Sequence, residues 1–255
     1  MKISLGLDDS VKVGKIGAPS GGTPQSPPTA AMGYRVRWPV LDNNYCYSDA
    51  GTTKAVNTDP VQQWNDALVV VASSNLSQAT LGLRPIFTTG GSGGKSYLAF
   101  DGTDDTFSNG LTIDNYMAVG ASTVTLALNI RSGYTTGSSI MRDASAWWRI
   151  MHITGNVIRL SVYDGASKDL DVSFTPGTPF VVSFKHDTGK IYGKKNNGAW
   201  SAGVTCGNRG GSTAFQMVQP GADVDLYDAS LANVVVSDAN IALVHGYLMS
   251  QLGIA

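Results

Sequence analysis

The sequence predicts an all-β protein: an antiparallel jelly-roll β-sandwich with a short C-terminal helix and an extended N-terminal arm. Three observations carry this prediction. All 19 acidic residues are Asp, which favours turns and caps, whereas Glu favours helix surfaces. The chain has 30 Gly and only 15% charged residues, a composition typical of strands joined by many turns. From about residue 95, apolar and polar residues alternate with the period of a half-buried strand.

The first 33 residues differ in composition from the rest of the chain. Four prolines (Pro19, Pro24, Pro27 and Pro28) lie there among Gly, Ser and Thr. Such a segment cannot bury enough apolar surface to pack on its own. We therefore expect residues 1–33 to form an extended anchoring arm that becomes ordered against a neighbouring subunit, or else a disordered tail. Residues 34–255 are expected to form the sandwich domain.

The strands can be placed from the alternation of side chains. They are predicted over residues 34–40, 96–100, 123–130, 157–163, 180–185 and 224–236. In the third of these, Val124 and Leu126 point to one face, while Thr123 and Thr125 point to a face expected to meet solvent. A helical turn is predicted over residues 59–64, because Asp59 can cap it and Pro60 suits its first position.

The last element changes period from two to that of a helix. Ser237 is a suitable N-cap, and Gly253 suits the stop. Between them one helical stripe is apolar: Ile241, Val244, Leu248 and Leu252. The prediction is a single C-terminal helix with one buried face.

Charge and hydropathy exclude several partners. The net charge is −1 and no basic run exceeds Lys194-Lys195, which argues against nucleic acid. No apolar stretch approaches the ~20 residues that span a bilayer, so membrane insertion is not expected. Residues 1–10 lack the apolar core of a signal peptide, which predicts synthesis and folding in a cytoplasm. Cys46 and Cys206 are expected as free thiols, with a single bridge as the alternative.

No cofactor, metal or catalytic motif stands out. The three histidines lie far apart in the sequence and not in metal-ligand spacing. Asp101, Asp104 and Asp105 suggest calcium by their hard oxygen atoms, but hydrogen bonding within an Asx turn explains them as well. We predict no cofactor, no metal and no catalytic residue.

Glycan cleavage needs a pair of carboxyl groups on either side of the scissile bond. With no Glu in the chain, the pairs available on one strand face are Asp169 with Asp171 and Asp223 with Asp225. Solvated, outward-pointing carboxylates are the expected interpretation of both pairs.

Sugar binding is the most plausible ligand chemistry, because aromatic faces stack on the apolar side of a sugar ring. Trp147 and Trp148 are adjacent in a strand, so they point to opposite faces. Tyr163, on an outward row, and Trp200, just past a turn, complete the candidate ligand-binding set. The alternative is that these rings cover the sandwich edges or fill a subunit interface.

Residues 60–255 resemble a known family through three ordered pieces. These are residues 61–66 (Val-Gln-Gln-Trp-Asn-Asp) followed by Gln78-Ala79-Thr80 and Arg84-Pro85, residues 98–105, and the strand 231–236 with the helix 241–248. Together they resemble the concanavalin A-like, laminin-G-like jelly-roll domains of many bacteriophage virion and bacterial surface proteins. The chain departs from that pattern in the apolar run 67–72 and at Asn233, which weakens the transfer of any ligand site.

The resemblance, with the Gly/Pro-rich arm, implies a non-enzymatic virion structural protein, either a head decoration or a tail or fibre component. Its expected partners are other virion subunits (capsid or tail proteins), further copies of itself in a homo-oligomer, and a host surface glycan. Its expected location is the virion. The alternatives are a carbohydrate-binding adhesin that recognises a host glycan and an Asp-dependent glycan-cleaving enzyme.

Overall fold

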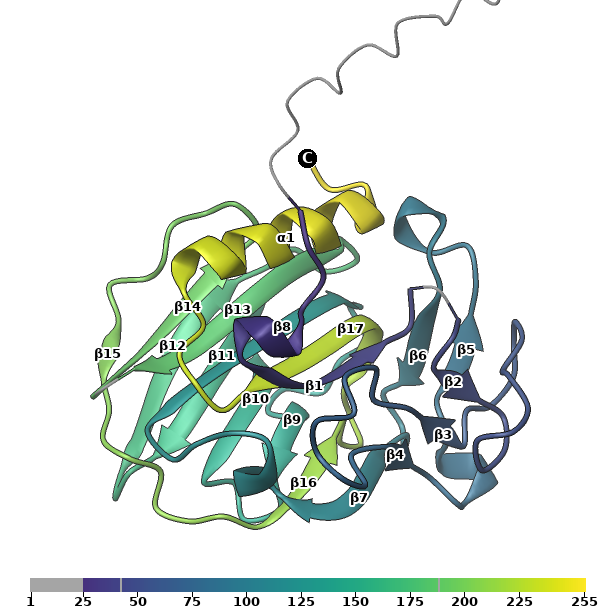
Figure 1. The fold of residues 1–255 in the computed structure, drawn as a ribbon, viewed down its shortest axis with the longest axis horizontal. Coiled ribbons are helices and arrows are strands. Elements are labelled where there is room, and N and C mark those ends of the chain that lie inside the picture. The colour runs from purple at the N-terminus through teal and green to yellow at the C-terminus, as the bar shows by residue number, and fades with distance from the viewer. Residues whose placement is uncertain (1–24, 42, 188) are drawn as a thin grey trace, which may run out of the picture.

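Two antiparallel sheets face each other in the computed structural model (Figure 1), which describes residues 25–41, 43–187 and 189–255. The described chain contains one α-helix, α1 (Asp238–Leu252), close to its C-terminal end. The predicted fold class, a β-sandwich with a short C-terminal helix, is confirmed. No helix among these residues is both long and apolar enough to cross a membrane.

Sheet A has eight strands. Seven follow the order β15-β14-β13-β8-β17-β6-β5, and β1 pairs with the C-terminal half of β17. Its strands are β1 (Tyr34–Pro39), β5 (Ile86–Thr88), β6 (Tyr97–Asp101), β8 (Ala121–Ile130), β13 (Phe180–Asp187), β14 (Lys190–Lys195), β15 (Val204–Thr205) and β17 (Asp223–Ala232). The two long strands, β8 and β17, pair with each other at the centre of the sheet.

Sheet B has nine strands, in the order β12-β11-β10-β9-β16-β7-β4-β3-β2. They are β2 (Cys46–Tyr47), β3 (Gln63–Trp64), β4 (Leu76–Ser77), β7 (Phe107–Thr112), β9 (Ser139–Asp143), β10 (Trp148–Ile153), β11 (Val157–Tyr163), β12 (Ser167–Ser173) and β16 (Ala214–Met217). Consecutive strands β9 to β12 form a meander, so sequence neighbours also lie side by side in this half of the sheet.

The main core lies between the sheets and is rich in aromatic rings. Trp38 of β1 stacks on Phe215 of β16 with ring centroids 5.7 Å apart, and Trp64 of β3 meets Phe107 of β7 at 6.2 Å. All four rings are fully buried. Such rings bury large apolar areas, so this cluster is a principal source of the sandwich's stability.

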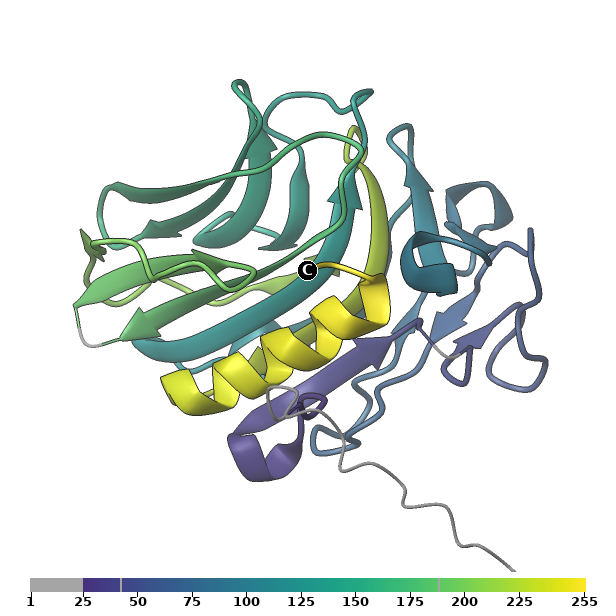
Figure 2. The same ribbon diagram turned by 90° about the horizontal axis from the view of Figure 1, so that it is seen from above.

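Helix α1 covers the outer face of sheet A, so that this sheet lies between sheet B and the helix (Figure 2). The Ser237 hydroxyl accepts a hydrogen bond from the Asn240 amide, and Gly253 ends the helix at φ 68°. Leu248 and the rest of the predicted apolar stripe are buried against the sheet. The predicted helix, with its cap, stripe and stop, is confirmed.

A chain of buried hydrogen bonds joins α1 to sheet A. His245 Nδ1 lies 2.7 Å from the Asn196 carbonyl, so Nδ1 carries the proton and Nε2 accepts from the Ser183 hydroxyl at 2.8 Å. Ser183 in turn meets Thr125 at 2.7 Å, and Thr125 meets the Tyr34 hydroxyl at 2.9 Å. With this tautomer, each hydroxyl donates to the next group in the chain, from Tyr34 through Thr125 and Ser183 to His245.

These contacts correct the prediction that one face of residues 123–130 meets solvent. Thr123 and Thr125 are both fully buried, because the segment around α1 covers them. The Thr123 hydroxyl also accepts from the Val236 amide and donates to the Val234 carbonyl. Alternation marked the two faces correctly, but a polar face covered by a helix has the same pattern as a solvated one.

The predicted helical turn over residues 59–64 is wrong, because this segment is extended. Its amides bond to neighbouring strand segments: Val61 N–H donates to the Pro85 carbonyl and Gln62 N–H to the Tyr47 carbonyl, both at 2.9 Å. Asp59 caps the preceding turn instead, by accepting from the Val56 amide. Extension places Val61 and Trp64 in the core, and that burial outweighs local capping.

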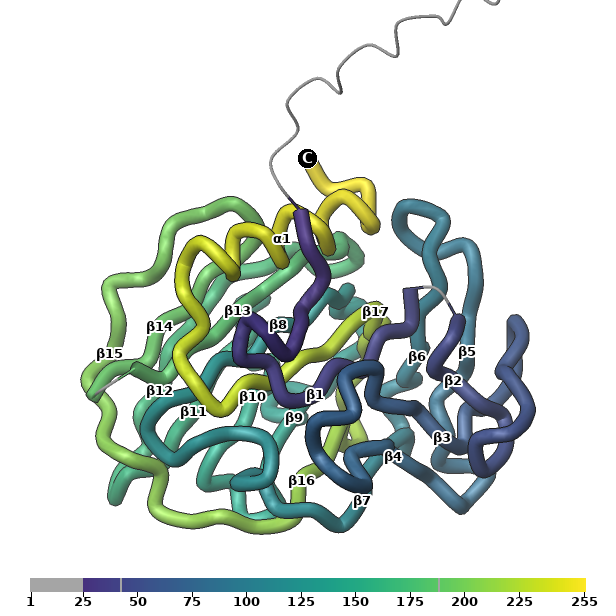
Figure 3. The backbone as a smooth tube through the Cα atoms, viewed as in Figure 1, coloured from purple at the N-terminus to yellow at the C-terminus, as the bar shows by residue number. Residues whose placement is uncertain are grey.

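The described part of the predicted arm, residues 25–33, runs beside α1 (Figure 3). The Ser26 amide donates to the Leu243 carbonyl at 3.2 Å, and Met32 packs against the core beneath the helix. Residues 1–24, which hold most of the predicted arm, lie outside the described residues. The division into an arm of residues 1–33 and a domain of residues 34–255 stays a prediction.

Candidate functional site

Two of the predicted sugar-binding rings meet at the end of sheet B. Trp147 precedes β10 and Tyr163 ends β11, and their ring centroids are 5.0 Å apart at 69°. The Tyr163 amide donates to the Trp147 carbonyl at 2.8 Å, so strand pairing holds the rings together. With Ser145 and Ala146 they line a cavity of about 170 Å³, and Tyr163 is 40% exposed.

The indole of Trp147 rests on a glycine pair of the loop between β15 and β16. A Cβ atom at Gly210 would lie 2.5 Å from the indole ring, and one at Gly211 would lie 2.8 Å from it. Only glycine fits so close a contact. The Gly210 amide also donates to the Tyr163 carbonyl at 2.7 Å. The loop therefore fixes the position of both rings.

A buried carboxylate, Asp143, organises the β9–β10 turn that presents Trp147. Its Oδ1 accepts from the Trp148 amide at 2.8 Å and its Oδ2 from the Thr213 hydroxyl at 2.7 Å. Its carbonyl accepts from the amide of Ala146, a residue held at φ 57° in the left-handed region. A non-glycine residue adopts that conformation only where its surroundings impose it. The turn is therefore built to hold one shape.

The outer face of sheet B carries a polar row beside the aromatic pair. The strand registers place Arg142, Arg149, Ser161 and Asp169 opposite one another on β9, β10, β11 and β12. In the next row Arg159 bonds to both Asp169 and Asp171, with its Nε 2.6 Å from Asp171 Oδ1. Arg149 therefore lies two residues along the chain from Trp147, and Arg142 lies opposite Arg149 on the neighbouring strand.

The other two predicted ligand-binding residues do not join this pair. Trp148 points to the opposite face of β10 from Trp147, as alternation requires, and is only 2% exposed in the inter-sheet core. Trp200 packs at the edge of the core beneath α1, with the Lys185 ammonium 4.4 Å from its ring centroid. Neither ring presents a free face beside the cavity.

Sequence reasoning missed Asp143, Arg149 and the glycine pair. Arg149 is the easiest to find in retrospect, because it follows Trp147 by two residues and so shares its face of the strand. Asp143 and Gly210-Gly211 reach the site only through pairing of distant segments, which leaves no local signal.

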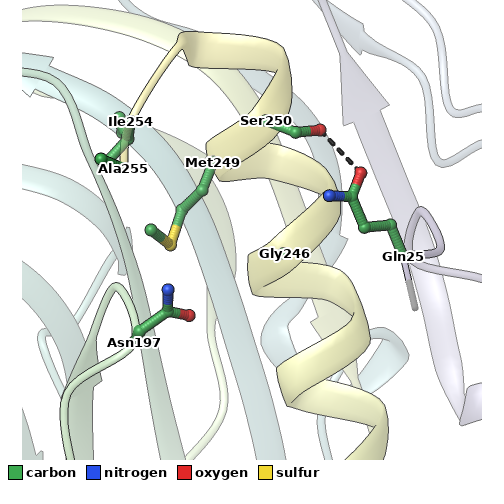
Figure 4. Close-up of a pocket in the computed structure, with 7 residues that line it drawn as sticks. All are labelled: Gln25, Asn197, Gly246, Met249, Ser250, Ile254 and Ala255. Carbon is green, nitrogen blue, oxygen red and sulfur yellow. Dashed lines mark hydrogen bonds between the residues drawn. The ribbon is translucent and has the colours of Figure 1, made fainter. Parts of the chain in front are cut away.

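A second cavity, of about 130 Å³, lies beside α1 (Figure 4). The Ser250 hydroxyl donates to the Gln25 side-chain carbonyl there at 2.8 Å, and Met249 reaches towards Asn197. Among the described residues that line it, none has an aromatic or charged side chain. It therefore offers neither the stacking surface nor the charge that recognition of a sugar would use.

The acidic cluster at residues 101–105 is organised as a turn. Carboxylate oxygens of Asp101, Asp104 and Asp105 lie within 4.8 Å of one another. Asp105 accepts from the Asp101 amide at 2.9 Å, and Asp101 accepts from the Thr103 amide at 2.7 Å. Burial, together with the neighbouring carboxylates, raises the pKa of Asp105 to about 6. Asx-type hydrogen bonding accounts for this geometry.

Both carboxylate pairs considered for glycan cleavage are held by arginine. Asp169 and Asp171 bind Arg159, whereas Asp223 and Asp225 lie 2.6 Å and 3.5 Å from Arg131 Nε. Asp225 is 6% exposed, which corrects the expectation that it is solvated. Its burial raises its pKa.

Several solved structures with a similar fold are of a sialidase and an arabinofuranosidase. Trypanosoma rangeli sialidase in complex with sialic acid is 13% identical, with a TM-score of 0.58 over 92% of this chain and 37% of that chain. A mutant of the same sialidase that displays trans-sialidase activity is 11% identical, with a TM-score of 0.55 over 90% of this chain and 35% of that chain. A GH54 α-L-arabinofuranosidase soaked with a cyclic sulfate inhibitor is 10% identical, with a TM-score of 0.56 over 88% of this chain and 64% of that chain.

These similarities show a shared β-sandwich fold, and the chain spans only about a third of the sialidase chain's length. No protein-family model matches the chain, and no curated protein sequence matches it either.

The comparisons overturn the prediction of a non-enzymatic bacteriophage structural protein. The solved structures reported above are glycosidases, and none is described as a virion, tail or decoration protein. The Gly/Pro-rich arm misled the interpretation, because such a composition indicates poor self-packing and carries no information about what the segment binds.

Proposed function

We propose that this chain is a carbohydrate-recognition domain of a glycan-acting protein, and that it binds a sugar ring at Trp147 and Tyr163. The observation that carries the proposal is the partly exposed aromatic pair lining a cavity at the end of sheet B. Aromatic faces stack on the apolar side of a sugar ring, while neighbouring polar groups bond its hydroxyls. Ser145 supplies such a group at the cavity wall.

The size and rigidity of the site support this proposal. The cavity of about 170 Å³ is smaller than the ~300–1,000 Å³ clefts that enclose a drug-sized ligand, so it suits one ring of a longer saccharide. Strand pairing, the glycine pair and Asp143 fix the two rings before any ligand arrives. A preorganised site avoids the entropy cost of ordering side chains on binding.

The comparisons also support it. The chain resembles about a third of a sialidase and about two thirds of an arabinofuranosidase, as a component of a larger glycan-processing enzyme would. The concanavalin A-like sandwich that the sequence resembles is a lectin-like scaffold, which supports recognition of a glycan. Self-association of the chain stays a prediction.

Glycan cleavage by the chain itself is a second candidate function. Its supporting observation is the Asp223–Asp225 pair, where burial raises the pKa of one carboxyl beside another carboxylate. Glycoside hydrolysis uses one protonated and one ionised carboxyl group. Reducing-end release from an oligosaccharide panel, lost in Asp225→Asn, would support cleavage; no release by the wild type would refute it.

A glycan array followed by calorimetric titration of the best ligand tests the proposed recognition function. We expect Trp147→Ala to weaken binding at least tenfold, as truncation of a central aromatic anchor does. Trp200→Ala is the matched control, because it removes a candidate indole from the other side of the molecule and should leave affinity unchanged. Undiminished binding by a folded Trp147→Ala variant would refute the site.

A further inference from the structure

Two arginines lie side by side next to the aromatic pair. Arg149 of β10 is paired in register with Arg142 of β9, so the two side chains leave the sheet on the same face. Arg149 follows Trp147 by two residues and therefore stands on its face, about 7 Å further along the strand. A saccharide seated on Trp147 would extend over these guanidinium groups.

Neither arginine forms an ion pair with a residue in the described part of the chain. Among the residues that the structure describes, no carboxylate lies within 4 Å of either guanidinium. Arg142 donates to the carbonyls of Asp143 and Ala144, which are uncharged acceptors. The Nε of Arg149 is buried and has no hydrogen-bond partner. Two carboxylates of this face, Asp169 and Asp171, are both bound by Arg159.

This arrangement is unfavourable without a ligand. Two like charges on paired strand positions repel each other, and a buried guanidinium N–H without an acceptor loses the hydrogen bond it would make in water. An anionic group placed between the guanidiniums would offset their repulsion. Carboxylates and sulfate esters suit the site best, because the planar guanidinium bonds two of their oxygen atoms together.

We propose that the ligand of this site is an acidic saccharide, whose sugar ring stacks on Trp147 and Tyr163 while its carboxylate or sulfate group binds Arg149 and Arg142. This inference rests on the proposed carbohydrate-recognition function and adds the ligand's charge. It also assigns separate roles on one face: the aromatic pair holds the ring, and the arginine pair selects for negative charge.

The test compares matched acidic and neutral ligands. Galacturonic acid trisaccharide is titrated against its methyl ester, and sulfated galactose disaccharide against its unsulfated form, at low and high salt. We expect at least one acidic member to bind tenfold or more tightly than its neutral partner, with the preference falling as salt rises. Arg149→Gln should abolish that preference. Lys190→Gln, which removes the same charge from an exposed position in sheet A, should keep it.

An acidic preference lost in Arg149→Gln and kept in Lys190→Gln supports the inference. Equal binding of acidic and neutral partners, lost in Trp147→Ala, overturns the charge selection and leaves the proposed recognition function standing. Equal loss of the preference in both charge variants overturns it as well, because net charge alone would then explain the effect. Absence of binding to every saccharide on the array overturns both proposals.

Discussion

The polar groups beneath α1 on sheet A and the arginine pair on the outer face of sheet B differ in how they are satisfied. On sheet A, Thr125 and Ser183 lie beneath α1, and their hydroxyls belong to an unbroken hydrogen-bonded chain that ends at His245. On sheet B, no helix of the described chain covers the meander, and the buried Nε of Arg149 has no partner. Helix α1 therefore completes the hydrogen bonding of the hydroxyls beneath it on sheet A (the closed face), and we infer that the arginine pair on the outer face of sheet B (the open face) takes its partner from a ligand.

The largest expected effect comes from loosening the helix on the closed face. Leu248→Ala should lower the free energy of unfolding by about 2–5 kcal/mol, because it leaves a cavity between α1 and sheet A. Tyr163→Ala, the matched truncation on the open face, should cost less than about 1 kcal/mol, since its ring is partly in solvent. Urea denaturation of both variants measures the difference. Equal losses would refute the distinction between the two faces.

The hydrogen-bonded chain on the closed face should make stability depend on pH. Burial lowers the pKa of His245 to about 4 from an ordinary 6.5, so the unfolded chain takes up a proton that the folded protein does not. Stability should therefore fall as pH drops from about 6.5 towards 4, by no more than about 3 kcal/mol from this residue.

Urea denaturation at a series of pH values tests this dependence. His245→Gln should show a flatter fall in stability than the wild type. A residual slope will persist from His152, whose pKa burial also lowers to about 4. If the variant and the wild type lose stability in parallel over this range, the buried neutral state of His245 is refuted.

On the open face, the support beneath the aromatic pair should affect both stability and binding. Asp143→Ala leaves the Trp148 amide and the Thr213 hydroxyl without their acceptor, which should cost about 1–3 kcal/mol. Glycan affinity should fall as well, because the turn that carries Trp147 is then free to move. Thermal unfolding and calorimetric titration report the two effects. Unchanged affinity in a destabilised protein would show that Asp143 does not position Trp147.

The smallest effect is expected from the ion pairs of the open face. Arg159 binds Asp169 and Asp171 in partial contact with solvent, and such exposed pairs contribute about 0–1 kcal/mol. Arg159→Gln should therefore change the midpoint of urea unfolding only slightly. A loss comparable to that of Leu248→Ala would mean that the charges of sheet B hold the sandwich together.

Local sequence signals predicted the elements well where one interaction dominated. Alternation located β8 and β11, and Ser237 with Gly253 marked the ends of α1. The same signals could not show that α1 covers Thr123 and Thr125, since a polar strand face looks alike under a helix and in water. His245 on the apolar stripe was the one hint, because a buried histidine needs hydrogen-bonding partners.

Of the candidate site, the sequence pointed to two aromatic residues and not to their assembly or support. Trp147 and Tyr163 could be chosen as aromatic residues on outward rows, but their contact depends on the β10–β11 register and on Gly210-Gly211, some 50 residues further along the chain. The same dependence on register hid the pairing of Arg149 with Arg142. Function was harder still, since a sandwich fold hosts many activities.

Hydrogen exchange of the backbone amides, with and without the saccharide selected by the array, tests most directly which face binds. We predict slowed exchange at residues 145–149 and 161–167, which surround the aromatic and arginine pairs on sheet B, and unchanged exchange in α1. Slowed exchange confined to α1 and Asn197, beside the second cavity, would contradict the assignment of the open face as the glycan site.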